Sequence, residues 1–179
     1  MAFFSRFFES KEDRMLKSAE ALLLISNEFS RQLLEPIYQK FPQLVEQIEP
    51  KNKIIKYNEA SKWDLTITVA CIFIAKSKAR DILYNNPSKE LVQNIIEQSM
   101  ITWQKESIFM LNDLENFYWD DLNGKSMKEY DSQLSPADSL GRWVIKTLTN
   151  HYPNSQEEYS MGRVIGITII ESFSKYWIK

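Results

Sequence analysis

The sequence contains a single cysteine, Cys71, and this scarcity excludes two kinds of site. One thiol cannot form an intrachain disulfide, and it cannot supply a cysteine-rich zinc site. Cys71 lies within a strongly apolar stretch, Leu65 to Ala75. Reactive thiolates need an electropositive and partly exposed setting, so we expect Cys71 to be a small, inert core residue.

Histidine is equally scarce, since His151 is the only one. A lone histidine excludes multi-histidine metal sites, including carboxylate bundles built on Glu-x-x-His pairs. The chain has no Gly-x-Ser-x-Gly motif, and no two carboxylates stand out as a general acid and base. We therefore expect no metal, no cofactor and no catalytic residues.

Glycine and proline are also few, with four and six residues respectively in a chain of 179. Antiparallel β-proteins need frequent turns with positive φ, which glycine supplies, so this composition favours helices joined by a few connections. Long hydrophobic runs are lacking as well. A membrane-spanning helix needs about 20 apolar residues, whereas the uncharged stretch Val164 to Ile170 is far shorter. We expect no transmembrane segment.

The net charge of −2 is unevenly distributed. Residues 1–89 hold 14 Lys and Arg against 11 Asp and Glu, and residues 90–179 hold 8 against 13. A protein that binds nucleic acid usually concentrates basic residues on one face, and these totals do not favour one. We therefore expect no nucleic-acid partner.

The first nine residues form a distinct N-terminal segment that is rich in phenylalanine. Phe3 and Phe7, like Phe4 and Phe8, are four residues apart, so a helix would bring each pair together. Arg6 interrupts the apolar run and no cleavage site follows, which disfavours a signal peptide and favours a cytoplasmic protein. The segment is either a turn that covers the core or an appendage that contacts a membrane or a partner.

Prolines and capping signals divide residues 1–179 into about six helices of a single domain. The first begins at Ser10 and reaches Pro36, which ends or kinks it. Another extends from about Ser88 to the turn residue Gly124, and a third begins at Ser135. Apolar or small residues recur at helical spacing in the first of these helices, at Met15, Ala19, Leu22, Ser26, Phe29 and Leu33.

Two apolar helices are predicted at the centre of this bundle, at about residues 59–84 and 156–178. Asn58 is the expected N-cap of the first, and Ser155 with Glu158 forms a capping box for the second. The second contains Gly162 and Gly166, whose spacing suits close packing against the first helix. Its β-branched residues leave a strand as the alternative.

The stretch from Asp113 to Asp138 combines acidic and aromatic side chains. Each helical residue turns about 100°, so Phe117, Tyr118 and Trp119 cannot all face the core. Two aspartates near a helix C-terminus oppose the macrodipole, so replacing Asp120 and Asp121 by asparagine is expected to leave folding intact. The candidate partner-binding residues are Asp113, Glu115, Tyr118, Trp119, Asp120, Asp121, Tyr130 and Asp131.

These features favour an all-α, non-enzymatic protein-binding module. A basic protein partner is expected, as with small immunity or adaptor proteins, because acidic fields attract basic surfaces. One alternative is a bundle that encloses a small apolar ligand, and a further one is an enzyme that uses carboxylates and tyrosines. Homo-oligomerisation is left open.

Overall fold

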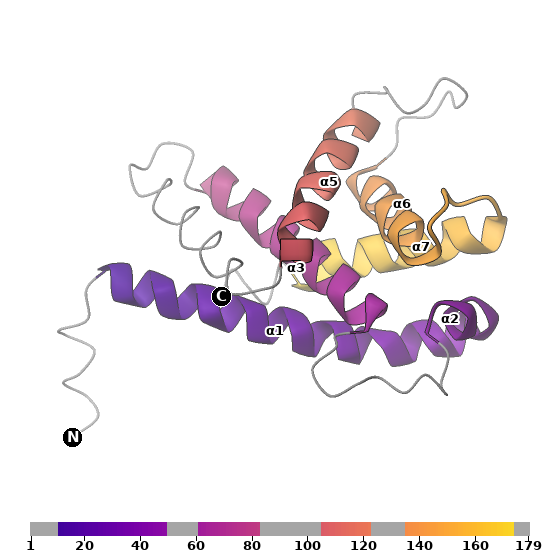
Figure 1. Cartoon of the computed structure of the whole chain (residues 1–179), viewed down its shortest axis with the longest axis horizontal. Helices are drawn as coiled ribbons and strands as arrows, with labels where there is room; N and C mark the ends of the chain where they lie inside the picture. The colour runs from indigo at the N-terminus through magenta and orange to yellow at the C-terminus, as the bar shows by residue number, and fades with distance from the viewer. Residues whose placement is uncertain (1–10, 50–60, 83–104, 123–134, 174–179) are drawn as a thin grey trace.

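The structure is a computed structural model that describes residues 11–49, 61–82, 105–122 and 135–173. These ranges are almost entirely helical and contain no strand, which confirms the all-α prediction (Figure 1). The helical elements are α1 (Lys11–Lys40), α2 (Pro42–Ile48), α3 (Lys62–Ile82), α5 (Lys105–Leu122), α6 (Pro136–Thr149) and α7 (Gln156–Thr168), and a π-helical turn, η2 (Ile169–Phe173), continues α7.

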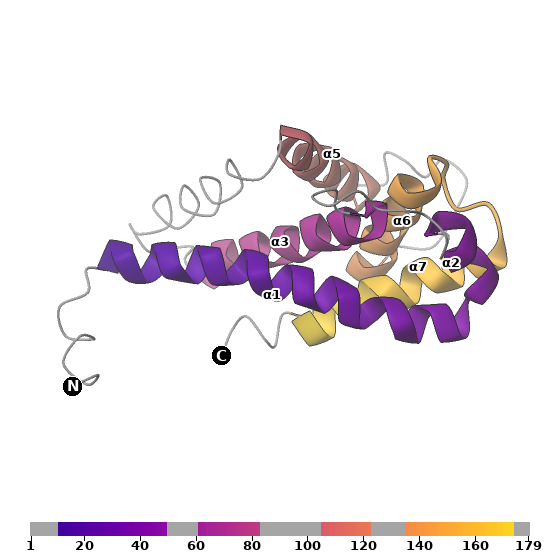
Figure 2. The same cartoon turned by 60° about the horizontal axis from the view of Figure 1, so that its bottom comes forward.

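Helix α3 lies at the centre of the bundle. Every residue from Thr66 to Ala75 is buried, as a helix that is apolar nearly all round requires. It packs against α1, α5, α6 and η2, and the two views place α1 and α5 on different sides of it (Figures 1 and 2). The prediction of a buried helix in this segment is confirmed.

Helix α6 also lies at the centre of the bundle. Leu140, Trp143, Val144 and Leu148 are all buried, and α6 contacts α3, α5 and α7. Helix α7 instead packs chiefly against α6, and Arg163 and Ile167 on its outer side are exposed. The predicted helix at 156–178 also includes η2, and the C-terminal segment meets α3 mainly through that part.

Glycines allow the backbones of α6 and α7 to touch. A Cβ atom on Gly141 would overlap the carbonyl oxygen of Gly162, and one on Gly166 would overlap that of Ala137. A Cβ on Gly162 would lie 2.9 Å from the carbonyl oxygen of Gly141. The glycines are packing residues as predicted, although their partner helix is α6.

Helix α1 passes through Pro36 instead of ending there. Pro36 is exposed, and the residues on the inner side that follow it, Ile37 and Phe41, are buried. Proline removes one backbone hydrogen bond on the solvent side. The helix continues beyond Pro36 because the buried Ile37 and Phe41 anchor the following turn in the core. Ser30 ties α1 to α3, because its hydroxyl donates to Asp64 Oδ1 at 2.6 Å.

Two helix starts differ from the prediction. The predicted cap Asn58 lies outside the described residues, and α3 is capped by Ser61, whose Oγ accepts from the Asp64 N–H at 3.0 Å. At α7, Ser155 Oγ accepts from the Glu158 N–H at 3.2 Å. The Glu158 carboxylate, however, accepts from the Asn154 N–H at 2.7 Å, so the reciprocal half of the box is displaced by one residue.

The start of α6 follows its prediction. Ser135 Oγ accepts from the Asp138 N–H at 3.1 Å, and the Asp138 carboxylate accepts from the Ser135 N–H at 3.3 Å. Pro136 occupies the first turn, where its missing N–H has no consequence.

Two further predictions concern the ends of the chain and the membrane. The N-terminal segment with Phe3, Phe4, Phe7 and Phe8 lies outside the described residues. Within the described ranges, none of the helices combines the length and apolar character that crossing a membrane requires.

Gly166→Ala should lower the free energy of unfolding. Alanine is favoured over glycine in a helix by about 1 kcal/mol, but its methyl group would overlap the Ala137 carbonyl oxygen, and overpacking costs about 1–3 kcal/mol or more. Gly166→Leu should be more damaging. Thermal or urea denaturation measures both, with Ile167→Ala at the adjacent exposed position as control. A higher melting temperature for Gly166→Ala would show that the helix contact is loose.

Cys71 should react with a bulky thiol reagent only after unfolding. The side chain is fully buried, and burial raises the pKa of the Cys71 thiol well above its ordinary value. Both effects suppress attack by the thiolate. Labelling in native buffer and in denaturant, followed by mass spectrometry, gives the comparison. Fast labelling of the native protein would contradict the packed position of α3.

Candidate functional site

Helix α5 is amphipathic, with a narrow buried stripe along one side. The buried residues recur at steps of three or four and are Ser107, Leu111, Leu114, Phe117 and Asp121. Lys105 is the only basic residue between Lys105 and Leu122, whereas five residues there are acidic. The helix therefore depends on its neighbours for cations.

Helices α3 and α6 supply those cations on both flanks of α5. Lys76 Nζ of α3 lies 2.8 Å from Glu115 Oε1. On the other flank, the Trp143 indole N–H donates to Asp113 Oδ2 at 2.8 Å, and Lys146 Nζ lies 3.8 Å from the same oxygen. Part of the predicted acidic field is thus neutralised within the chain.

Asp121 does not belong to an exposed surface, which corrects its assignment as a partner-binding residue. It is only 2% exposed, because it lies one turn beyond Phe117 on the buried stripe. The Arg142 Nη1–H donates to Asp121 Oδ1 at 2.7 Å, and this ion pair joins α5 to α6. Asp121 Oδ2 and Arg142 Nε find no hydrogen-bond partner within the described ranges.

The three consecutive aromatics of α5 point in different directions, as the sequence predicts. Phe117 is buried, and Tyr118 packs edge-on against Phe73 of α3 with ring centroids 4.9 Å apart. Trp119 is 49% exposed and its ring contacts Tyr118 at 5.6 Å. Trp119 is therefore the aromatic residue of this group that can meet a partner.

An aromatic and cationic cluster closes the seam between α5 and α6. Phe117 stacks on Tyr152, with centroids 6.0 Å apart. Lys146 Nζ lies 5.1 Å from the Phe117 ring centroid and 5.7 Å from that of Tyr152. The connection before α7 is thereby held against the inner side of α5.

The outer side of α5 carries a row of four exposed residues, Phe109, Asn112, Asn116 and Trp119, here named the α5 ridge. Their spacing of three, four and three residues places them on one side of the helix. Phe109 is 74% exposed, and ten residues separate it from Trp119, which corresponds to about 15 Å along the axis. Sequence analysis missed Phe109, although it lies opposite the buried stripe.

The remaining predicted residues fall into two groups. Asp120 is partly exposed and lies one turn beyond Asn116, at the border of the α5 ridge. Tyr130 and Asp131 lie outside the described residues. Among the described residues there is also no group of three or more His, Cys, Asp or Glu side chains that could hold a metal ion.

Comparisons with models of protein families, with curated proteins and with solved structures found no match. The function of the α5 ridge therefore has to be inferred from its own geometry and chemistry.

Asp121→Asn should destabilise the fold, contrary to the expectation from sequence. Removing one member of a buried ion pair leaves the other charge uncompensated, at a cost of roughly 3–5 kcal/mol. Urea denaturation of Asp121→Asn beside Asp120→Asn, which removes the same charge from the same helix end, measures the difference. Equal and small effects of the two variants would contradict the buried pair.

Proposed function

We propose that this protein is a non-enzymatic protein-binding module that holds its partner with the α5 ridge. The observation that carries this proposal is the exposure of Phe109 and Trp119 on one side of a single helix. Large aromatics are enriched at protein interfaces and provide much of their binding energy. The asparagines between them offer both donors and acceptors for hydrogen bonds across a contact.

The attachment of α5 supports the same proposal. Glu115 contacts α3 on one flank of the helix, and Asp113 contacts α6 on the other. Asp121 joins the buried side of the helix to α6. A ridge held in this way loses little conformational freedom when a partner binds, and this reduces the entropic cost of association.

The partner that fits is a protein with an apolar contact surface bordered by Arg or Lys. Carboxylates border the α5 ridge on both sides, with Glu115 on one and Asp113 and Asp120 on the other. An arginine of the partner could stack on Trp119 and approach these carboxylates. Because Lys76 and Lys146 already offset two of them, long-range attraction is weaker than the sequence suggests.

Small cytoplasmic immunity or adaptor proteins act in this manner, and we assign the chain to that functional type. The single buried thiol is compatible with a reducing compartment.

Phe109→Ala and Trp119→Ala should each weaken partner binding at least tenfold, since truncation of a central aromatic typically costs about 2 kcal/mol or more. Neither change should unfold the protein, because Phe109 is largely exposed and Trp119 is about half exposed. The matched control is Leu24→Ala, which removes an apolar side chain with the same 74% exposure from α1. Affinity capture from the native host identifies the partner, and calorimetry with the purified pair gives the affinities.

Capture alone does not support the proposal, whereas loss of binding in the ridge variants with retention in Leu24→Ala does. Unchanged affinity in both ridge variants would remove α5 as the binding surface. If the chain associates with itself and this association disappears in the same variants, the partner is a second copy of this chain and not a basic protein.

A further inference from the structure

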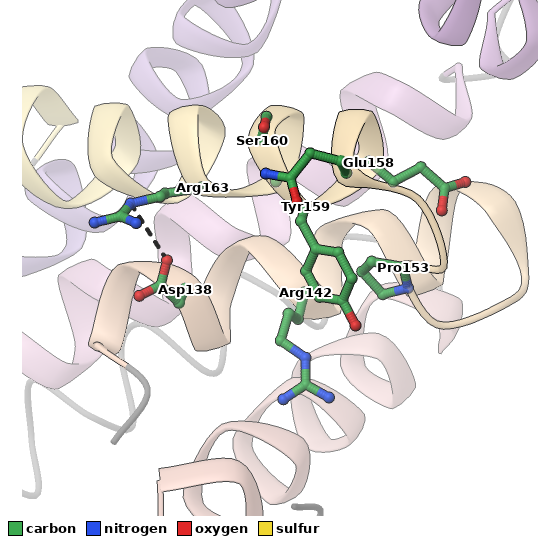
Figure 3. A pocket seen from close by; sticks show the side chains of 9 residues that line it. Asp138, Arg142, Pro153, Glu158, Tyr159, Ser160 and Arg163 are labelled. Carbon is green, nitrogen blue, oxygen red and sulfur yellow. Dashed lines mark ion pairs between the residues drawn. The ribbon is translucent and has the colours of Figure 1, made fainter. Parts of the chain in front are cut away.

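A polar pocket lies between α6, α7 and the connection that joins them (Figure 3). Its volume of about 300 Å³ is at the lower end of the range for small-molecule sites. Its walls include Asp138 and Arg142 of α6, Tyr159 and Arg163 of α7, and Pro153 of the connection. The α5 ridge contributes no residue to this lining.

One end of the pocket presents two opposite charges side by side. Arg163 Nε lies 3.6 Å from Asp138 Oδ1, which is too far for a hydrogen bond. The other oxygen of Asp138 is engaged by Ser135 at the start of α6. The Arg163 side chain is 66% exposed, and within the described ranges its guanidinium donates no hydrogen bond. Both groups can therefore accept a ligand without breaking a strong contact.

The middle of the pocket has an aromatic and apolar wall. The ring of Tyr159 reaches from α7 across to α6, beside Arg142 and Pro153 (Figure 3). Pro153 is buried, and the Tyr159 hydroxyl makes no hydrogen bond to the described residues. Arg142 is directed toward α5, where it binds Asp121, so it contributes mainly its aliphatic stem here.

The opposite end carries a carboxylate that is already in use. Glu158 Oε2 accepts from the Asn154 N–H at 2.7 Å, and Oε1 lies 3.6 Å from His151 Nε2. The pair formed by Asp138 and Arg163 is thus the part of the pocket with unused binding capacity.

We propose that this pocket binds a free α-amino acid. The carboxylate of the ligand lies on the Arg163 guanidinium, its ammonium group lies on Asp138 Oδ1, and its side chain contacts Tyr159 and Pro153. An α-amino acid carries its ammonium and carboxylate groups on the same carbon atom, so its two charges lie close together, which suits two protein charges 3.6 Å apart. A ligand with only a carboxylate would bind Arg163 and place its negative charge next to Asp138. A ligand with only an amine would bind Asp138 and place its positive charge next to Arg163, so each would meet a like charge.

The experiment is isothermal calorimetry on the full chain, after a thermal-shift comparison of the free L-amino acids tested one at a time. L-Phenylalanine, 3-phenylpropionate and phenethylamine form the matched set, because they share one side chain and differ in their charged groups. The amino acid should bind at least tenfold more tightly than either singly charged analogue. Equal binding of the three compounds would overturn the proposal. So would the absence of binding of every amino acid at about 10 mM, a concentration above the dissociation constant of even a weak site.

Variants separate this site from general effects. Arg163→Gln should weaken amino-acid binding at least tenfold. It should leave the far-UV circular dichroism spectrum of the helices unchanged, since the side chain is exposed. Arg31→Gln, which removes an exposed arginine from α1, should bind as the parent chain does. Trp119→Ala should also leave this affinity unchanged, which keeps the test independent of the α5 ridge. Unchanged affinity in Arg163→Gln would refute the assigned contact.

Discussion

The buried ion pair between Asp121 and Arg142 is the interaction on which the arrangement of α5 and α6 depends. Two charges removed from water must satisfy each other, because an unpaired one would cost several kcal/mol. This requirement holds the C-terminal turn of α5 against α6 and so sets which side of α5 faces solvent. Trp119 is exposed as a direct consequence, since it lies two residues, or about 200° of helical rotation, from Asp121.

The contact between α6 and α7 provides a second constraint of a different kind. The two backbones touch at Gly141, Gly162 and Gly166. Such close packing brings side chains at the edges of the contact between the two helices within reach of each other. Arg163 and Asp138 meet in this way across the two helices. The α5 ridge and the polar pocket are made of different residues. Arg142 lines the pocket and also forms the ion pair with Asp121 that holds α5.

Local signals predicted most of the helices. Ser135 with Pro136 marks the start of α6, and the apolar stretch around Cys71 marks the buried α3, because capping and burial on all sides depend on nearby residues. Of the two alternatives predicted at Pro36, an end or a kink, the structure excludes the end, because packing of Ile37 and Phe41 outweighs one lost hydrogen bond. The prediction also placed the glycines of α7 against α3, whereas they pack on α6, since small residues reveal a close contact but do not identify the partner.

The sequence by itself determined the helical class and the buried position of Cys71, because composition and local periodicity settle these. Its single cysteine and single histidine also leave no intrachain disulfide and no multi-histidine site. It also showed that one aromatic of α5 must face solvent. Only the tertiary structure decided which carboxylates are available, since the cations that offset Glu115 and Asp121 come from α3 and α6. Charge pairing between helices depends on the angle at which they pack, and that angle is a property of the whole core.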